Sequence, residues 1–106
     1  MRRWIVTDRD GRDIYLTEER WEHIEIRHEE LIGHREDVLN SLRFGRRRQE
    51  RRDPQRFRYR HPCEGLSDGS NSITVIVIFG FTQLDDGTEI ANNFVTTAWG
   101  ETAPEI

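Results

Sequence analysis

The pattern of hydrophobic and polar residues predicts one short strand at the start of the chain and several strands in its second half. Residues 73–81, "ITVIVIFGF", form an almost continuous β-branched run, which is typical of a buried central strand. Residues 56–61, "RFRYRH", alternate arginine with aromatic residues, which predicts a strand with one charged and one aromatic face. We expect further strands over residues 3–8, "RWIVTD", and residues 92–99, "NNFVTTAW".

Helical spacing appears between these strands. Trp21, Ile24 and Leu31 recur at intervals of three and seven residues, which places them on one face of a helix. Thr17 is a suitable N-cap for this helix, and two glutamates follow it. Residues 34–45, "HREDVLNSLRFG", predict a second helix that ends at a glycine.

The order and spacing of these elements predict an α+β fold. We expect two N-terminal helices, packed on one face of a twisted antiparallel sheet of about four strands, because the strands are joined by short connections. The chain length predicts a single domain over residues 1–106. We expect its core over residues 14–100 and a tail over residues 101–106.

One segment reverses the charge of the chain. The protein has a formal net charge of −4, yet Arg43–His61 holds nine arginines against Glu50 and Asp53, a local charge of +7. Arginine binds phosphate through a planar fork, so we favour RNA binding over a solvated edge hairpin that charge keeps from aggregating. The residues that we expect to contact RNA are Arg46, Arg47, Arg48, Arg51, Arg56, Arg58 and Arg60.

Several classes of protein do not fit this sequence. No stretch approaches the roughly 20 apolar residues that a membrane span needs, and the first residues contain no apolar segment of a signal peptide. The single cysteine, Cys63, cannot form an internal disulfide. We therefore expect a soluble cytoplasmic protein that does not act at a membrane.

Motifs for metals and nucleotide cofactors are also missing from the sequence. The four histidines, His23, His28, His34 and His61, do not match zinc-site spacing, and no phosphate-binding glycine loop or nucleophile elbow is present. We therefore predict neither a metal nor a cofactor. A metal-dependent nuclease that uses His23, His28 and acids of the same helix remains an alternative.

The remaining polar residues suit the cleavage of RNA without a metal. In this reaction the 2′-hydroxyl attacks the adjacent phosphorus, and the enzyme supplies a base, an acid and cations. Histidine can move protons near neutral pH, and arginine can stabilise the charge on phosphate. Within the arginine-rich segment, Tyr59 can stack on a base or donate a proton.

Five stretches of the chain resemble the phage- and toxin-associated members of the barnase–EndoU–colicin–RelE nuclease superfamily. They are "LTEERWEHIEIRHEEL", "EDVLNSLRFG", "FRYRH", "ITVIVIF" and "NNFVTTAW", and the resemblance spans roughly residues 14–100. The short patterns H-I-x-x-R-H and V-x-T-A-aromatic carry most of it. This resemblance implies a metal-independent endoribonuclease, often the toxin of a toxin–antitoxin pair.

The resemblance also implies site residues. His23 matches the first helix histidine, Arg27 and His28 match an arginine–histidine pair, Tyr59 matches a strand aromatic, and Thr97 matches the final threonine. Trp99 departs from the pattern, because a tyrosine is commoner at that position. The partners implied are RNA and a cognate antitoxin protein.

Two points stay open on the sequence. The alternative to an enzyme is a non-catalytic module of the same fold that binds RNA or a protein through the arginine-rich hairpin. An exposed edge of that hairpin can also pair with a second copy of the chain to form a homodimer.

Overall fold

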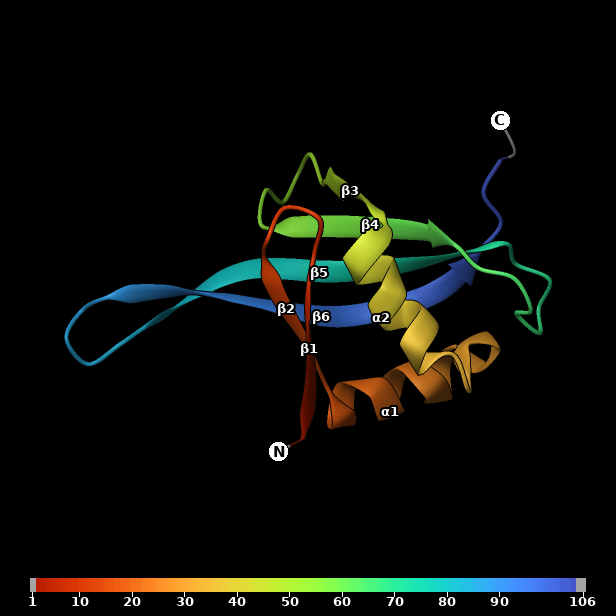
Figure 1. Ribbon diagram of the computed structural model, residues 1–106, viewed down its shortest axis with the longest axis horizontal. Coiled ribbons are helices and arrows are strands. Elements are labelled where there is room, and N and C mark those ends of the chain that lie inside the picture. Colours follow the sequence, from red (N-terminus) through yellow and green to blue (C-terminus); the bar gives the residue numbers. More distant parts are fainter. Residues whose placement is uncertain (1, 105–106) are drawn as a thin grey trace.

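The protein folds into one mixed sheet, with α2 on one of its faces and α1 along β6. The structure is a computed structural model that describes residues 2–104. Its elements in chain order are β1 (Arg3–Thr7), β2 (Asp13–Thr17), α1 (Glu18–Arg27), the 3₁₀ turn η1 (Glu29–Leu31), α2 (Arg35–Phe44), β3 (Arg46–Gln49), β4 (Arg56–Pro62), β5 (Ser72–Gln83) and β6 (Glu89–Glu101). The six strands lie in the order β1-β2-β6-β5-β4-β3, and only β2 and β6 run parallel (Figure 1).

The predicted fold class is wrong about the sheet and about the place of the helices. The sheet has six strands and is mixed, and the helices lie in the middle of the chain, after the β1–β2 hairpin. The sequence "DIYLT" is a full strand, with Ile14 and Leu16 buried, but its alternation is too short to separate it from the helix that follows. The parallel pairing arises because β2 and β6 are far apart in the chain and so need no short connection.

The start of α1 confirms the predicted N-cap. The hydroxyl oxygen of Thr17 accepts a hydrogen bond from the backbone N–H of Arg20 at 3.1 Å, and two glutamates occupy the first turn. The helix ends earlier than its apolar stripe suggests, because His28 is its C-cap and Leu31 belongs to η1. Among residues 2–104, no helix is long and apolar enough to cross a membrane.

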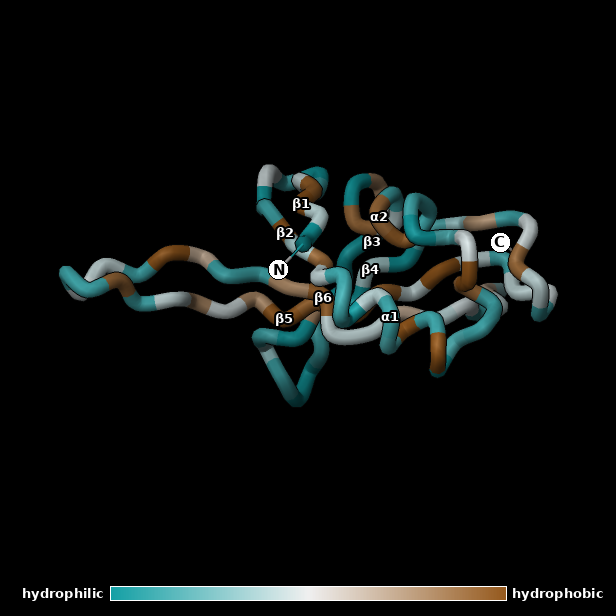
Figure 2. The backbone as a smooth tube through the Cα atoms, turned by 90° about the horizontal axis from the view of Figure 1, so that it is seen from below, coloured by the Kyte–Doolittle hydropathy of each residue, from teal (hydrophilic) through white to brown (hydrophobic). Residues whose placement is uncertain are grey.

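The hydrophobic core lies between the helices and one face of the sheet. Helix α2 packs on β4 and β5, and α1 packs against β6 and β2. Fully buried side chains from both layers meet there, including Leu31, Leu42, Ile73 and Val75. Figure 2, which views the sheet from its edge, shows α2 and the β1–β2 hairpin on the same side of β5 and β6. The other face of the sheet is not covered by a helix.

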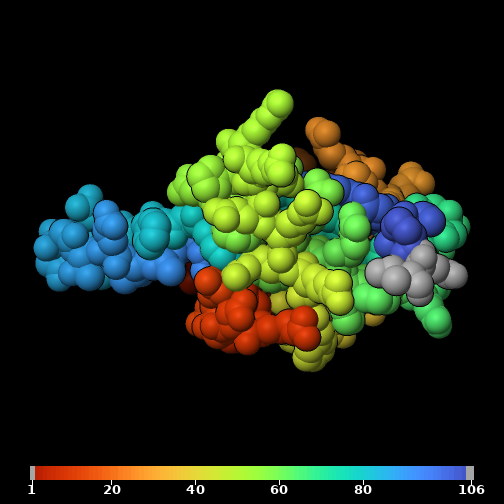
Figure 3. Space-filling view, turned by 90° about the horizontal axis from the view of Figure 1, so that it is seen from above, coloured from red at the N-terminus to blue at the C-terminus, as the bar shows by residue number. Residues whose placement is uncertain are grey.

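Two segments project from this body. The distal halves of β5 and β6 form a long hairpin, and every residue over 81–91 is exposed. This hairpin extends the molecule to 49 Å along its longest axis (Figure 1, Figure 3). The connection between β3 and β4 stands out on the uncovered side of the sheet (Figure 2, Figure 3).

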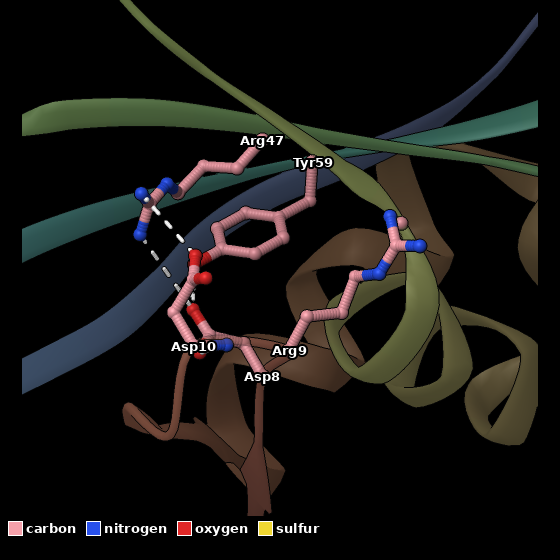
Figure 4. Close-up of a pocket in the computed structure, with 6 residues that line it drawn as sticks. Asp8, Arg9, Asp10, Arg47 and Tyr59 are labelled. Carbon is pink, nitrogen blue, oxygen red and sulfur yellow. Dashed lines mark hydrogen bonds and ion pairs between the residues drawn. The ribbon is translucent and has the colours of Figure 1, made fainter.

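A hydrogen bond joins the first turn of the chain to β4. The hydroxyl of Tyr59 donates to the Oδ2 atom of Asp8 at 2.6 Å, and both residues are buried (Figure 4). The Oδ1 atom of Asp8 accepts from the backbone N–H groups of Asp10 and Arg12 at 2.9 Å each. These bonds hold the β1–β2 turn against β4 on the covered face of the sheet, next to the edge strand β3.

These contacts shift the pKa values of both partners. Burial raises the pKa of Asp8, but the hydrogen bonds from Tyr59 and from the two backbone N–H groups outweigh it, and the net pKa lies below its ordinary value. Burial and the bond to Asp8 both raise the pKa of Tyr59. The stability that Asp8 contributes is therefore present above its unfolded pKa and is lost as the pH falls through its lower folded pKa.

Tyr59→Phe tests this fastening. We expect the variant to lose about 1.5–3 kcal/mol of unfolding free energy at pH 7, because a buried carboxylate loses its side-chain donor. The pKa of Asp8 should rise, so acid unfolding should begin at a higher pH than in the wild type. Urea titrations followed by circular dichroism at several pH values measure both effects. Tyr15→Phe, on the other sheet face, is the control, and equal behaviour of the two variants would contradict the assignment.

Candidate nucleic-acid interface

The uncovered face of the sheet gathers arginines from two strands. In the antiparallel register Arg46 lies opposite Arg60 and Arg48 lies opposite Arg58, so each pair projects from the same face. Arg56 joins them, because residues alternate between faces along β4. Five of the seven arginines predicted to contact RNA therefore lie side by side on one face.

Acidic groups on this face hold two of the five arginines. The guanidinium of Arg58 lies 3.3 Å from the carboxylate of Glu50. Arg60 donates to the carboxylate of Glu101, which also accepts a 2.7 Å hydrogen bond from the hydroxyl of Thr74. Arg46, Arg48 and Arg56 take part in none of the ion pairs found among residues 2–104. These three remain available to an external anion.

The electrostatics of this face keep Glu101 ionised at neutral pH. Burial raises the pKa of Glu101, but the hydrogen bond from Thr74 and the charges of Arg60 and Arg58 outweigh burial, and the net pKa lies below its ordinary value. The carboxylate therefore orients Arg60 as a negatively charged acceptor.

Thr97, Trp99 and the buried Ile76 continue the arginine face across β5 and β6. Thr97 lies opposite Ile76, and Trp99 lies opposite Thr74. Ile76 is fully buried but does not belong to the main core cluster, since it lies on the uncovered face beneath its neighbours. The guanidinium carbon of Arg58 lies 5.9 Å from the centre of the Trp99 ring. An indole beside arginines is a surface on which a nucleic-acid base can stack.

The end of α1 reaches the same face. β2 pairs with β6 only at Asn93 and Phe94, so the later part of β6 has an edge without a strand partner among residues 2–104. The backbone N–H of Gly100 on that edge donates to the Oε2 atom of Glu30 at 3.0 Å. This contact brings the His28 ring to 6.4 Å from the Trp99 ring, centre to centre. Of the predicted site residues His23, Arg27 and His28, it is His28 that lies beside Trp99.

The other predicted site residues lie in different surroundings. His23 and Arg27 are exposed on α1, and Arg27 adjoins His28 at the end of that helix. Arg51 is exposed in the connection between β3 and β4. Tyr59 lies on the covered face, buried against Asp8, so it cannot stack on a base or deliver a proton on the arginine face.

Arg47 also lies on the covered face. It is paired with Tyr59 in the sheet register, and its guanidinium lies 3.3 Å from the carboxylate of Asp10 and 3.9 Å from that of Asp8. These residues line a pocket of about 250 Å³ on that side, together with Arg9 and Gly45 (Figure 4). The ion pairs that cross this pocket give Arg47 a structural role.

Sequence reasoning missed two members of the uncovered face. From the sequence, Trp99 is only a departure from a family pattern and Glu101 belongs to the tail, whereas both residues lie in β6, which ends at Glu101. A signal for both was available. Thr97, Trp99 and Glu101 are spaced by two residues, and this spacing puts them on the same face of a strand.

The chain was compared with known proteins in three ways. No family model, no curated protein and no solved structure matches it.

Single arginine substitutions test the RNA-binding face. Arg48→Ala and Arg56→Ala should each weaken binding of single-stranded RNA and should reduce the slope of log affinity against log salt by about 0.7, the value for one lost phosphate contact. Fluorescence anisotropy with a labelled oligonucleotide over a range of salt concentrations measures this slope. Arg9→Ala on the opposite face is the charge-matched control, and an equal loss in that variant would show that only net charge matters.

Proposed function

We propose that the protein is a metal-independent endoribonuclease that binds single-stranded RNA along the arginine face. The observation that carries the proposal is the placement of His28 beside Trp99 at the end of a surface of five arginines. A proton-transferring group thus adjoins a surface suited to phosphates and bases. The resemblance of the sequence to a nuclease superfamily supports the same activity.

This face supplies one proton-transferring group and the cations that the proposed reaction needs. The 2′-hydroxyl of the RNA attacks the adjacent phosphorus and the 5′-oxygen leaves, so that a 2′,3′-cyclic phosphate forms. His28, the C-cap of α1, exchanges a proton with one of these two oxygens, and water exchanges the proton of the other. Arg58 and its neighbours stabilise the charge on the pentavalent phosphate, and Thr97 donates its hydroxyl to a phosphate oxygen.

Further groups position the RNA. Trp99 stacks on a base next to the cleaved phosphate, and Arg46, Arg48 and Arg56 hold the phosphates beyond it. Glu101 acts on the RNA through Arg60, whose guanidinium it orients, and is therefore a positioning residue. Arg27 is close in sequence to His28 and adds positive charge at the end of the helix.

We further propose that this nuclease acts in the cytoplasm as the toxin of a toxin–antitoxin pair. A cognate antitoxin would cover the arginine face with acidic side chains, as the charge of the face requires. β3 is an edge strand of the sheet, so its free backbone groups can also receive a strand of the antitoxin or of a second copy.

A binding module without catalysis is the second candidate. The arginines and Trp99 form a surface for RNA without any contribution from His28. His23, the other histidine of α1, is exposed and lies more than one helical turn before His28. Both candidates predict salt-dependent RNA binding, but only the enzyme produces new 2′,3′-cyclic ends.

RNA cleavage in excess chelator tests the proposal. Purified protein is incubated with total cellular RNA, and the new ends are sequenced. We expect discrete cuts that end in cyclic phosphates, and His28→Ala should reduce their rate by about 10²–10⁴-fold, the usual contribution of general acid–base catalysis. His23→Ala is the matched control from the same helix and should retain more activity.

Three other results have distinct meanings. Loss of cleavage on chelation in a protein that stays folded would favour a metal-dependent nuclease. Equal activity of wild type and His28→Ala would contradict the assigned site. RNA binding without cleavage, on free RNA and on translating ribosomes alike, would leave the binding module.

A further inference from the structure

Three metal-ligating side chains meet on the helix-covered side of the sheet. His34 is the N-cap of α2, Asp37 lies in the first turn of that helix, and Cys63 follows the last residue of β4. One ligand atom from each lies within 4.8 Å of the other two. No other group of three such residues meets this condition within residues 2–104. All three side chains are partly buried, so they are shielded yet open to an incoming ion.

The geometry of this cluster is close to that of a bound divalent ion. The Nδ1 atom of His34 and the Oδ2 atom of Asp37 are already 2.8 Å apart. Zinc bonds of about 2.0–2.3 Å in a tetrahedron place neighbouring ligand atoms about 3.3–3.8 Å apart. The separation of the His34 and Asp37 atoms must therefore widen by about 0.5 Å, and the distances to Cys63, which are at most 4.8 Å, must fall into the same range; changes of rotamer can supply both.

The chemistry of the donors selects among metals. A thiolate and an imidazole favour zinc over magnesium or calcium, which prefer oxygen ligands. A cation is disfavoured at the N-terminus of a helix, but Asp37 and the Cys63 thiolate bring two negative charges, which balance the two charges of the ion. The neutral site therefore does not oppose the dipole of α2.

We propose that the protein binds Zn²⁺ through His34, Asp37 and Cys63, with water as the fourth ligand. On binding, the Cys63 thiol releases its proton to solvent, and the sulfur bonds to the metal as a thiolate. The Nδ1 atom of His34 also bonds to the metal, so the neutral imidazole keeps its proton on Nε2. No electron is transferred, because Zn²⁺ has no redox chemistry.

The position of the ligands gives the ion a structural role. It ties the start of α2 to the end of β4, where the chain enters the connection to β5. An ion that binds only the folded state stabilises that state in proportion to its occupancy, and small domains often depend on such ties. The ligands come from α2 and from the strand end under it, whereas the arginine face lies on the other side of the sheet. This site is therefore independent of the proposed RNA cleavage.

Cobalt substitution tests the site directly. Metal-free protein is titrated with Co²⁺ and followed by absorption, and we expect a thiolate-to-cobalt charge-transfer band that saturates at one equivalent and disappears when Zn²⁺ is added. Zn²⁺ should also raise the Tm of the metal-free protein in a concentration-dependent way.

Matched variants separate this site from adventitious binding. Cys63→Ser should abolish the band, and His34→Ala should weaken zinc affinity by more than the roughly 10–100-fold that loss of an outer-shell partner costs. His23→Ala, an exposed histidine elsewhere, should bind like the wild type. Circular dichroism verifies that each variant is folded before titration, and the Tm series adds a readout that does not depend on colour.

Several outcomes would overturn the proposal. They are the absence of the band in the folded wild type, a zinc-dependent rise in Tm that Cys63→Ser and His34→Ala retain in full, and an equal loss in His23→Ala. Because these readouts do not involve RNA, failure of the nuclease assay leaves this proposal standing, and failure here leaves the nuclease proposal standing.

Discussion

The two-residue period of β4 is the constraint on which the rest of the structure depends. Side chains of a strand alternate between its faces, so Phe57 and Tyr59 point to the helices while Arg56, Arg58 and Arg60 point away from them. A helix cannot pack over the arginines of β4 without burying unpaired charges, so α2, which packs on β4 and β5, lies on the aromatic side. The core and the charged face are therefore two results of one alternation.

The same period sends Arg47 of β3 to the covered side, where its charge requires compensation. The β1–β2 turn supplies it, because Asp10 and Asp8 lie within 3.3 and 3.9 Å of the guanidinium. Asp8 in turn accepts the Tyr59 hydroxyl, so one acid serves both the stray arginine and the buried tyrosine. This need explains why the N-terminal hairpin folds over the sheet and closes the core at its far end.

The sequence predicts those parts of the fold and of the site whose signals are local. The N-cap at Thr17 and the buried strand around Val75 follow from neighbouring residues, and both are present in the structure. β2 was missed because its alternation spans five residues and runs directly into a helix. The parallel pairing of β2 with β6 depends on residues about 80 positions apart, for which a single sequence contains no signal.

Residue type alone does not predict which face of the sheet a side chain occupies. The sequence predicts that the arginines of the arginine-rich segment bind RNA together. Side chains alternate between the two faces of a strand, however, so Arg47 and Tyr59 lie on the covered face. The same alternation along β6 places Thr97 and Trp99 on one face, and this can be read from the sequence alone. The cluster of His34, Asp37 and Cys63 has no such regularity, because its ligands converge only once α2 has packed on the sheet. Spacing along a chain can exclude local zinc motifs, but it cannot exclude a site that tertiary packing assembles.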